Sequence, residues 1–279
     1  MNAFKLLLPF MLAATLISQA HAQDGKTIKI ATEGAFPPWN AVDTSGKPVG
    51  FDIDVGRALC DRAKLECEFV TQAWDGIIPA LNVGKYDAIM AGMSITEKRE
   101  QVIAFSEPYA LTSNYFVVGK SLDLPFMDSN EKIDLSSGNE GEAIALQALK
   151  KNLEGRVIGV QGSTNAEAFV REYFGSSVEV RIYDKQDNLN LDLVSGRIDA
   201  GLADYSVWKM FLESKDGAAA ALYGPRISGG VFGPGVGIGL KKQDKELAVR
   251  FNDAIEATAM DGTLKEISLK WFGADLVSR

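Results

Sequence analysis

Short apolar segments alternate with segments of helical periodicity along the first part of the chain. Residues 27–31, 66–70 and 86–90 are short and apolar or alternating, which predicts strands. Residues 51–63 and 77–83 carry apolar side chains at helical spacing, so each is expected to bury one face as a helix. The order strand, helix, strand, helix, strand is typical of an α/β sheet, whose ligand-binding residues gather at the carboxyl ends of the strands.

The same order of elements starts again at Arg156. The pattern predicts strands over residues 156–160, 178–183 and 198–202 and helices over residues 166–174, 188–195 and 205–212. A strand over residues 114–118 leads into this second unit, and the polar residues 120–154 are expected to form a surface excursion. After an interruption at Tyr223-Gly224-Pro225, a strand over residues 236–240 and a helix over residues 246–260 are expected to return to the first unit.

We therefore predict an α/β protein with two lobes. Residues 23–112 and 223–279 are assigned to lobe 1 and residues 113–222 to lobe 2. The chain then crosses between the lobes near residues 110–113 and again near residues 222–226. Two such segments form a hinge that opens and closes a cleft between the lobes.

The first residues have the features of an export signal. Lys5 supplies a positive charge, residues 6–17 are largely apolar, and Ala20-His21-Ala22 matches a cleavage site. We expect residues 1–22 to be a signal peptide and the mature chain to begin at Gln23. Removing Lys5 with the signal takes the formal net charge from −8 to −9.

Composition excludes several classes of chemistry. His21 is the single histidine and lies in the signal, so histidine-based catalysis and imidazole metal ligands are excluded from the mature chain. Two cysteines are too few for a thiolate zinc site, and we expect no metal and no cofactor. Cys60 and Cys67 are expected to form a structural disulfide, because the chain is exported. An acidic chain without basic runs argues against nucleic acid and anionic membrane as partners.

The segment of residues 85–99, KYDAIMAGMSITEKR, is the strongest candidate for a binding site. A buried strand ends in a turn at Gly92, and Ser94 and Thr96 precede a helix start that carries Arg99. Backbone N–H groups and a planar guanidinium at one position suit a carboxylate. An ordinary strand-to-helix turn with a surface arginine is the alternative interpretation.

Further candidate residues follow other predicted strands. Glu33 and Trp74 lie at strand ends in lobe 1, while Phe36 precedes the stiff Pro37-Pro38 pair. Ser163, Thr164 and Asp204 lie at strand ends in lobe 2. A plain helix N-cap remains the alternative for Thr164, and an exposed carboxylate the alternative for Glu33.

Several motifs together resemble the periplasmic solute-binding proteins for polar amino acids, the group with lysine/arginine/ornithine-, histidine- and octopine-binding proteins. They are VGFDIDVGRALC (49–60), WDGIIPAL (74–81), YDAIMAGMSITEKR (86–99), VIAFSEPY (102–109), GVQGST (159–164), LVSGRIDAGLAD (193–204) and DGTLKEISLKWFG (261–273). The resemblance implies a type II two-lobed fold, a periplasmic location and a role as the receptor of an ABC importer. Its partners are then a small ligand and a membrane permease, and we expect a monomer.

The resemblance also implies roles for the candidate residues. Arg99 holds the ligand's α-carboxylate, helped by the backbone N–H groups of Ser94 and Thr164. The α-amino group is held by Asp204, the Ser94 hydroxyl and the Gly92 carbonyl. Phe36 and Trp74 sandwich the aliphatic part of the ligand, and Glu33 meets a distal cationic group.

Departures from the family pattern leave undecided which amino acid or opine is the ligand. Glu33 and Phe36 stand where basic amino-acid binders commonly carry Asp and Tyr, and Ala91 and Gly92 replace two serines. Residues 120–154 and 227–240 resemble octopine- and nopaline-binding proteins, and Gly92 is expected to leave room for a second carboxylate, whereas Asp204 favours a free α-amino group.

We therefore expect a cationic amino acid (arginine, lysine, ornithine or histidine) or an arginine-derived opine such as octopine as the ligand. An exported dehydratase that uses Glu33 or Asp204 as its acid or base is the alternative. A partner role for a membrane chemoreceptor is compatible with the first interpretation.

Overall fold

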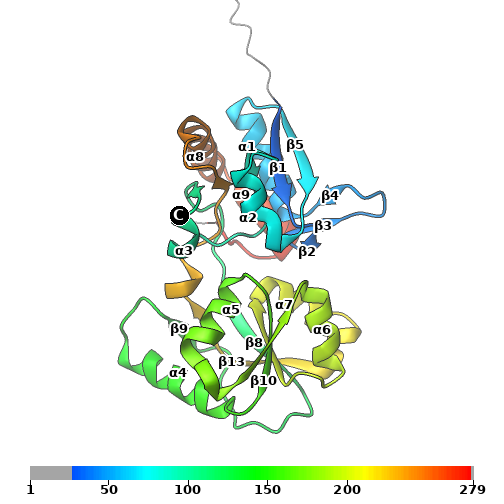
Figure 1. Cartoon of the computed structure of the whole chain (residues 1–279), viewed down its shortest axis with the longest axis vertical. Helices are drawn as coiled ribbons and strands as arrows, with labels where there is room; N and C mark the ends of the chain where they lie inside the picture. Colours follow the sequence, from blue (N-terminus) through cyan, green and yellow to red (C-terminus); the bar gives the residue numbers. More distant parts are fainter. Residues whose placement is uncertain (1–26, 278–279) are drawn as a thin grey trace, which may run out of the picture.

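The computed structural model describes residues 27–277. The predicted signal peptide, residues 1–22, lies outside the described residues. Two lobes lie one above the other along the long axis of the molecule (Figure 1). Lobe 1 is built on a five-stranded sheet and lobe 2 on a six-stranded sheet, which confirms the predicted two-lobed α/β fold.

The sheet of lobe 1 has the strand order β5-β1-β6-β14-β7. Its strands are β1 (Ile28–Thr32), β5 (Cys67–Thr71), β6 (Ala88–Ile89), β7 (Ala104–Phe105) and β14 (Gly239–Leu240). β1 pairs in parallel with β5 and β6, while β14 runs antiparallel between β6 and β7. The carboxyl ends of β1, β5 and β6 therefore share one edge of the sheet.

Helices flank this sheet, and a small second sheet extends it. The helices are α1 (Phe51–Ala63), α2 (Ile77–Asn82), α3 (Glu97–Glu100), α8 (Lys245–Met260) and α9 (Thr263–Phe272). The small sheet consists of β2 (Ala35–Phe36), β3 (Asn40–Val42) and β4 (Pro48–Val49). None of the helices between residues 27 and 277 is both long enough and apolar enough to cross a membrane.

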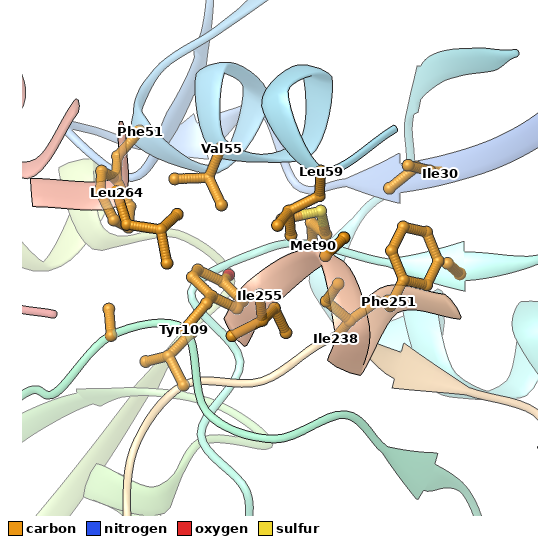
Figure 2. Packing of buried hydrophobic residues seen from close by; sticks show 14 of the residues in the cluster. Ile30, Phe51, Val55, Leu59, Met90, Tyr109, Ile238, Phe251, Ile255 and Leu264 are labelled. Carbon is orange, nitrogen blue, oxygen red and sulfur yellow. The ribbon is translucent and has the colours of Figure 1, made fainter. Parts of the chain in front are cut away.

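One apolar face of α1 forms the centre of the lobe 1 core. Phe51, Val55 and Leu59 recur every fourth residue, and each is fully buried. Figure 2 shows these side chains facing the α8 residues Phe251 and Ile255 across the core. Burying each such side chain contributes about 1.5 to 3 kcal/mol, so this apolar face helps to hold α1 and α8 together over the sheet.

The sheet of lobe 2 has the strand order β11-β10-β12-β8-β13-β9. Its strands are β8 (Asn114–Gly119), β9 (Lys132–Asp134), β10 (Val157–Gln161), β11 (Glu179–Tyr183), β12 (Ala200–Asp204) and β13 (Ala220–Ser228). The helices are α4 (Glu140–Asn152), α5 (Asn165–Phe169), α6 (Gln186–Val194) and α7 (Tyr205–Leu212). β10 pairs in parallel with β11 and β12, and β8 runs antiparallel to β12.

Two parts of lobe 2 differ from the sequence-based prediction. Residues 120–154 are more than a surface excursion, because β9 joins the sheet beside β13 and buries Ile133, and α4 buries Leu149 in the lobe 2 core. The predicted helix over residues 166–174 changes character, since α5 ends at Phe169 and a π-helical turn, Val170–Phe174, follows it.

The two connections between the lobes lie side by side. Ala110 and Val236 form an isolated antiparallel bridge, with the Val236 N–H donating to the Ala110 carbonyl at 2.8 Å. β13 stays in the lobe 2 sheet as far as Ser228, beyond the predicted lobe boundary at residue 222. We propose that the second connection follows Ser228 and that the lobes otherwise divide as the sequence predicts.

The predicted disulfide is confirmed. Cys60 near the end of α1 and Cys67 at the start of β5 are bonded, with their Cα atoms 6.3 Å apart. Cys67 is at the amino end of its strand. The disulfide therefore lies at the opposite end of β5 from the edge where the carboxyl ends of the strands meet.

Candidate functional site

A cleft lies between the two lobes and is partly open to solvent. The described residues that line it come from both lobes: Glu33, Phe36, Trp39, Trp74, Ala91, Gly92, Ser94, Arg99, Thr112, Asn114, Gln161, Thr164, Asn165, Ala166, Gln186, Leu202, Ala203 and Asp204.

Strand direction explains why these residues meet. Glu33 follows β1 and Ala91 follows β6, both at the carboxyl end of a parallel strand. Gln161 and Asp204 are the last residues of β10 and β12 in lobe 2. Asn114 lies at the same edge although it is the first residue of its strand. β8 runs antiparallel to β12, so the start of β8 is opposite Asp204 at the end of β12.

Arg99 is the buried cation of the cleft. Its guanidinium donates from Nη1 to the Ser94 carbonyl at 2.8 Å and from Nη2 to the Ser163 carbonyl of lobe 2 at 3.3 Å. The guanidinium also lies over the Trp74 ring, 5.2 Å from its centroid. Burial lowers the pKa of Arg99 to about 10, which leaves the group charged at neutral pH. The Thr96 hydroxyl caps α3, as predicted, by accepting from the Arg99 N–H.

Asp204 supplies an acidic group from lobe 2. The carboxylate caps α7, and its Oδ1 accepts from the Ser206 N–H at 2.8 Å. The Ser206 hydroxyl and the Trp39 indole N–H, the latter at 3.2 Å, donate to the same oxygen. Burial raises the pKa of Asp204 against the effect of these hydrogen bonds. Arg99 and Asp204 thus place opposite charges in the wall of one cleft.

Glu33 is a second acidic group, supplied by lobe 1. Its Oε1 accepts a hydrogen bond of 2.8 Å from the Gln161 amide of lobe 2. Burial raises the pKa of Glu33 to about 7, and the Gln161 hydrogen bond only partly opposes that effect. A cationic group entering the cleft would stabilise the ionised form of this carboxyl group.

Both the backbone conformation at residue 92 and the side chains packed beside it favour glycine at this position. Its φ of +59° is in the left-handed region that favours glycine. A Cβ at this position would lie 3.3 Å from the Trp39 ring and 3.5 Å from the Phe36 ring. The expectation that Gly92 leaves room for a second carboxylate is therefore wrong at this point, because two aromatic rings already fill the space above it.

The other predicted polar residues make hydrogen bonds to neighbouring residues of the protein. The Ser94 hydroxyl accepts from the Asn165 amide of lobe 2 at 2.8 Å. The Thr164 hydroxyl caps α5 and donates to the Gln161 carbonyl at 2.7 Å. Ser163 is exposed and is not part of the described cleft wall; it contributes its carbonyl to Arg99 instead of a side chain.

Sequence reasoning missed several wall residues: Trp39, Thr112, Asn114, Gln161, Asn165 and Gln186. Three buried polar atoms of the wall, Trp74 Nε1, Thr112 Oγ1 and Asn114 Nδ2, have no hydrogen-bond partner among the described residues. Buried polar groups are normally paired, so unpaired ones in a cleft are available to a ligand. Between residues 27 and 277, no cluster of three or more His, Cys, Asp or Glu residues could hold a metal ion.

Comparisons with known proteins agree with this geometry. The model of the bacterial extracellular solute-binding proteins, family 3, matches residues 28–274. The octopine-binding periplasmic protein of Rhizobium meliloti is 40% identical over 277 residues, covering 92% of this chain and 94% of the relative. The L-arginine-binding protein of Pseudomonas aeruginosa is 36% identical over 277 residues, covering 98% of each.

Solved structures are also similar to this chain. An ancestral arginine-binding protein bound to arginine superposes with a TM-score of 0.75 at 32% identity, covering 88% of this chain and 98% of that structure. Both the sequence match and the two-lobed architecture extend across nearly all of the described residues. The chain therefore belongs to family 3 of the bacterial extracellular solute-binding proteins.

Proposed function

We propose that this protein is the periplasmic substrate-binding component of an ABC importer for cationic amino acids or arginine-derived opines. The observation that carries the proposal is the position of Arg99 and Asp204 in one cleft wall, from opposite lobes. An amino acid has a carboxylate and a nitrogen cation on the same carbon. Opposite charges on the two sides of a cleft are complementary to that pair of groups.

The remaining wall residues suit the rest of such a ligand. The ligand's carboxylate would bind Arg99, and its α-nitrogen would donate to Asp204. Phe36 and Trp74 would pack against the methylene groups, while Glu33 would receive a guanidinium or ammonium group at the far end. The raised pKa of Glu33, about 7, is consistent with a carboxyl group that becomes fully ionised when a cation arrives.

The polar atoms of the wall and the similarity to a known protein favour an opine over a free amino acid. Thr112 Oγ1 and Asn114 Nδ2 lie in the wall without a hydrogen-bond partner among the described residues. Asn114 is also the residue opposite Asp204 in the neighbouring strand, so its side chain lies near the proposed position of the α-nitrogen. A second carboxylate close to the α-nitrogen would accept hydrogen bonds from both Thr112 and Asn114. Asp204 does not oppose this choice, because the secondary amine of an opine is still protonated and still donates hydrogen bonds. The relative of 40% identity is an octopine-binding protein.

We propose that the protein binds its ligand without converting it chemically. Glu33 and Asp204 are the carboxylates of the described wall, and each is hydrogen-bonded to an amide, hydroxyl or indole donor that holds it in place. Incubating the protein with prephenate or arogenate and following the substrate by NMR tests the dehydratase alternative. We expect the substrate to remain unchanged, and its consumption would overturn this part of the proposal.

We further propose that the mature chain is monomeric and delivers its ligand to a membrane permease. The relatives named above include a periplasmic protein, and periplasmic receptors of importers release their ligand when the hinge opens. Light scattering after size exclusion should give the mass of one chain. A stable dimer would contradict this part of the proposal.

Calorimetric titration tests the proposed ligand class. The panel should contain L-arginine, lysine, ornithine, histidine, octopine and nopaline, with glutamine as a neutral amino acid of similar length. We expect binding of one ligand per chain by at least one cationic or opine ligand, and tighter binding of octopine than of arginine. If none of the cationic or opine ligands binds, the proposed function fails.

A further inference from the structure

Trp39 belongs to the core of lobe 1. Its side chain is 1% exposed and packs on Phe51 and Phe272, with ring centroids 5.4 Å and 5.0 Å away. The carbonyl of Trp39 accepts the Asp52 N–H at 2.9 Å, at the start of α1. Both the ring and the backbone of Trp39 are therefore held by lobe 1.

The indole N–H of Trp39 nevertheless donates to lobe 2. Nε1 lies 2.8 Å from the Ser206 hydroxyl and 3.2 Å from Asp204 Oδ1. Ser206 accepts this hydrogen bond and donates its own hydroxyl to Asp204. The neighbouring Val207 packs into the lobe 1 core cluster, so apolar contact surrounds the polar one. These bonds require the lobes to be close together.

We propose that Trp39 is a positioning residue that stabilises the closed cleft through Ser206 and orients Asp204 toward the ligand. This inference rests on the proposed function, because it concerns the closed, ligand-binding form. Ser206 of lobe 2 already donates its N–H and its hydroxyl to Oδ1 of Asp204, and Trp39 adds a third donor from lobe 1. Closure of the lobes therefore completes the set of donors that holds this carboxylate.

The chain makes specific room for this indole. Gly92 has no Cβ, and a Cβ there would lie 3.3 Å from Cγ and Cδ2 of Trp39. A phenylalanine at position 39 would keep an aromatic ring in the core, although a smaller one, and would have no N–H to donate. The tryptophan therefore adds one directed interlobe hydrogen bond to an otherwise apolar contact.

A double-mutant cycle tests the proposal. Trp39→Phe removes the indole N–H, Ser206→Ala removes its acceptor, and the double variant removes both. Octopine and L-arginine would each be titrated, and dissociation rates followed by stopped flow. Each single variant should bind about threefold to thirtyfold more weakly, mostly through faster dissociation. Each change removes the buried Trp39–Ser206 hydrogen bond and one hydrogen bond to the Asp204 carboxylate.

The loss of affinity in the double variant should be smaller than the sum of the two single losses, because both changes remove the Trp39–Ser206 hydrogen bond, although each also removes a separate bond to Asp204. Trp271→Phe is the matched control. Its indole N–H donates to the Asp54 carboxylate at 2.8 Å within lobe 1, so its removal should leave ligand affinity within about twofold. Fully additive effects of Trp39→Phe and Ser206→Ala would overturn the proposal, as would unchanged dissociation rates.

A second measurement keeps this inference separate from the proposed function. The indole ¹H–¹⁵N signal of Trp39 is assigned by its loss in Trp39→Phe, and it should shift in Ser206→Ala but not in Trp271→Phe. If neither ligand binds the wild-type protein, the proposed function fails, and the inference is decided by this signal in the free protein. An indole signal unaffected by Ser206→Ala would overturn the inference.

Discussion

Gln161 donates a hydrogen bond of 2.8 Å to Glu33, from an amide of lobe 2 to a carboxylate of lobe 1. The bond joins the two sides of the cleft at a group whose pKa burial raises to about 7. Below that pH a proton occupies Glu33, and a cationic ligand end must displace it.

The first prediction concerns the pH dependence of binding. If the ligand's cationic end binds only ionised Glu33, affinity should rise about tenfold between pH 6 and pH 8, because the ionised fraction rises by that factor around a pKa of about 7. Calorimetry in buffers of different ionisation enthalpy should show proton release at pH 6 and almost none at pH 8. Glu33→Gln should bind more weakly and lose the pH dependence. A wild-type affinity that is flat over this range would contradict the role of Glu33.

The second prediction concerns Arg99. Replacing it with alanine should weaken binding at least about 100-fold, because two charge-assisted hydrogen bonds to a carboxylate are lost from a buried site. Arg99→Lys should recover only part of the affinity, since an ammonium group cannot make the bidentate contact. Lys98 is exposed next to it in the chain, and Lys98→Ala is the control, with affinity unchanged within about twofold. Equal losses in the two alanine variants would be incompatible with the proposed site.

The third prediction concerns Asp52, which is fully buried beneath the cleft loops. Its carboxylate accepts from Tyr109 at 2.6 Å and from Asn40 at 2.9 Å, and also from the Gly92 N–H. Asp52→Ala leaves these donors unpaired, so it should lower the free energy of unfolding by about 3 kcal/mol or more in urea denaturation. A loss below about 0.5 kcal/mol would show that the donors find other partners.

The raised pKa of Asp52 also predicts whether the free energy of unfolding rises or falls with pH. Burial raises its pKa to about 7, above the unfolded value, so the protonated form is favoured in the folded protein. The contribution of Asp52 is therefore fully present only below the unfolded pKa of 3.8 and is lost progressively as the pH rises from there to about 7. Asp52→Asn should flatten this dependence between pH 5 and pH 8. Because Glu33 titrates in the same range, the comparison should be made in the Glu33→Gln background.

The fourth prediction concerns the disulfide. Cys60 and Cys67 close a short loop with a sequence separation of 7. Chain entropy gives a stabilisation of about 2.5 kcal/mol for a loop of this size, so a double serine variant should unfold at correspondingly lower urea. Ligand affinity should change less than about twofold, since Cys67 starts β5 at the end remote from the cleft. Loss of binding with intact folding would contradict this separation.

Much of the fold follows from local periodicity. The apolar spacing of α1 predicts its observed bounds, Phe51–Ala63, because a helix covered on one side must repeat its apolar face. The rule that ligand residues follow parallel strands finds Glu33, Gly92 and Asp204, which all line the cleft. Ser163 also follows such a strand, but its backbone has a φ of +60° and its side chain is exposed.

The missed residues fall outside these rules. Asn114 is the first residue of an antiparallel strand, and the direction of β8 cannot be derived from its own apolar pattern. Trp39 follows two prolines, whose stiffness excludes a helix but does not say which way the next ring points. The burial of α4 depends on the pairing of β9 with β13, a contact between segments far apart in sequence.

A crystal structure of the protein with its bound ligand, L-arginine or octopine, tests the central claim most directly. We expect the α-carboxylate within about 3 Å of the Arg99 guanidinium and the α-nitrogen within about 3 Å of Asp204, as charge-assisted hydrogen bonds require. A ligand bound elsewhere, or bound in the cleft with neither group contacted, would contradict the claim.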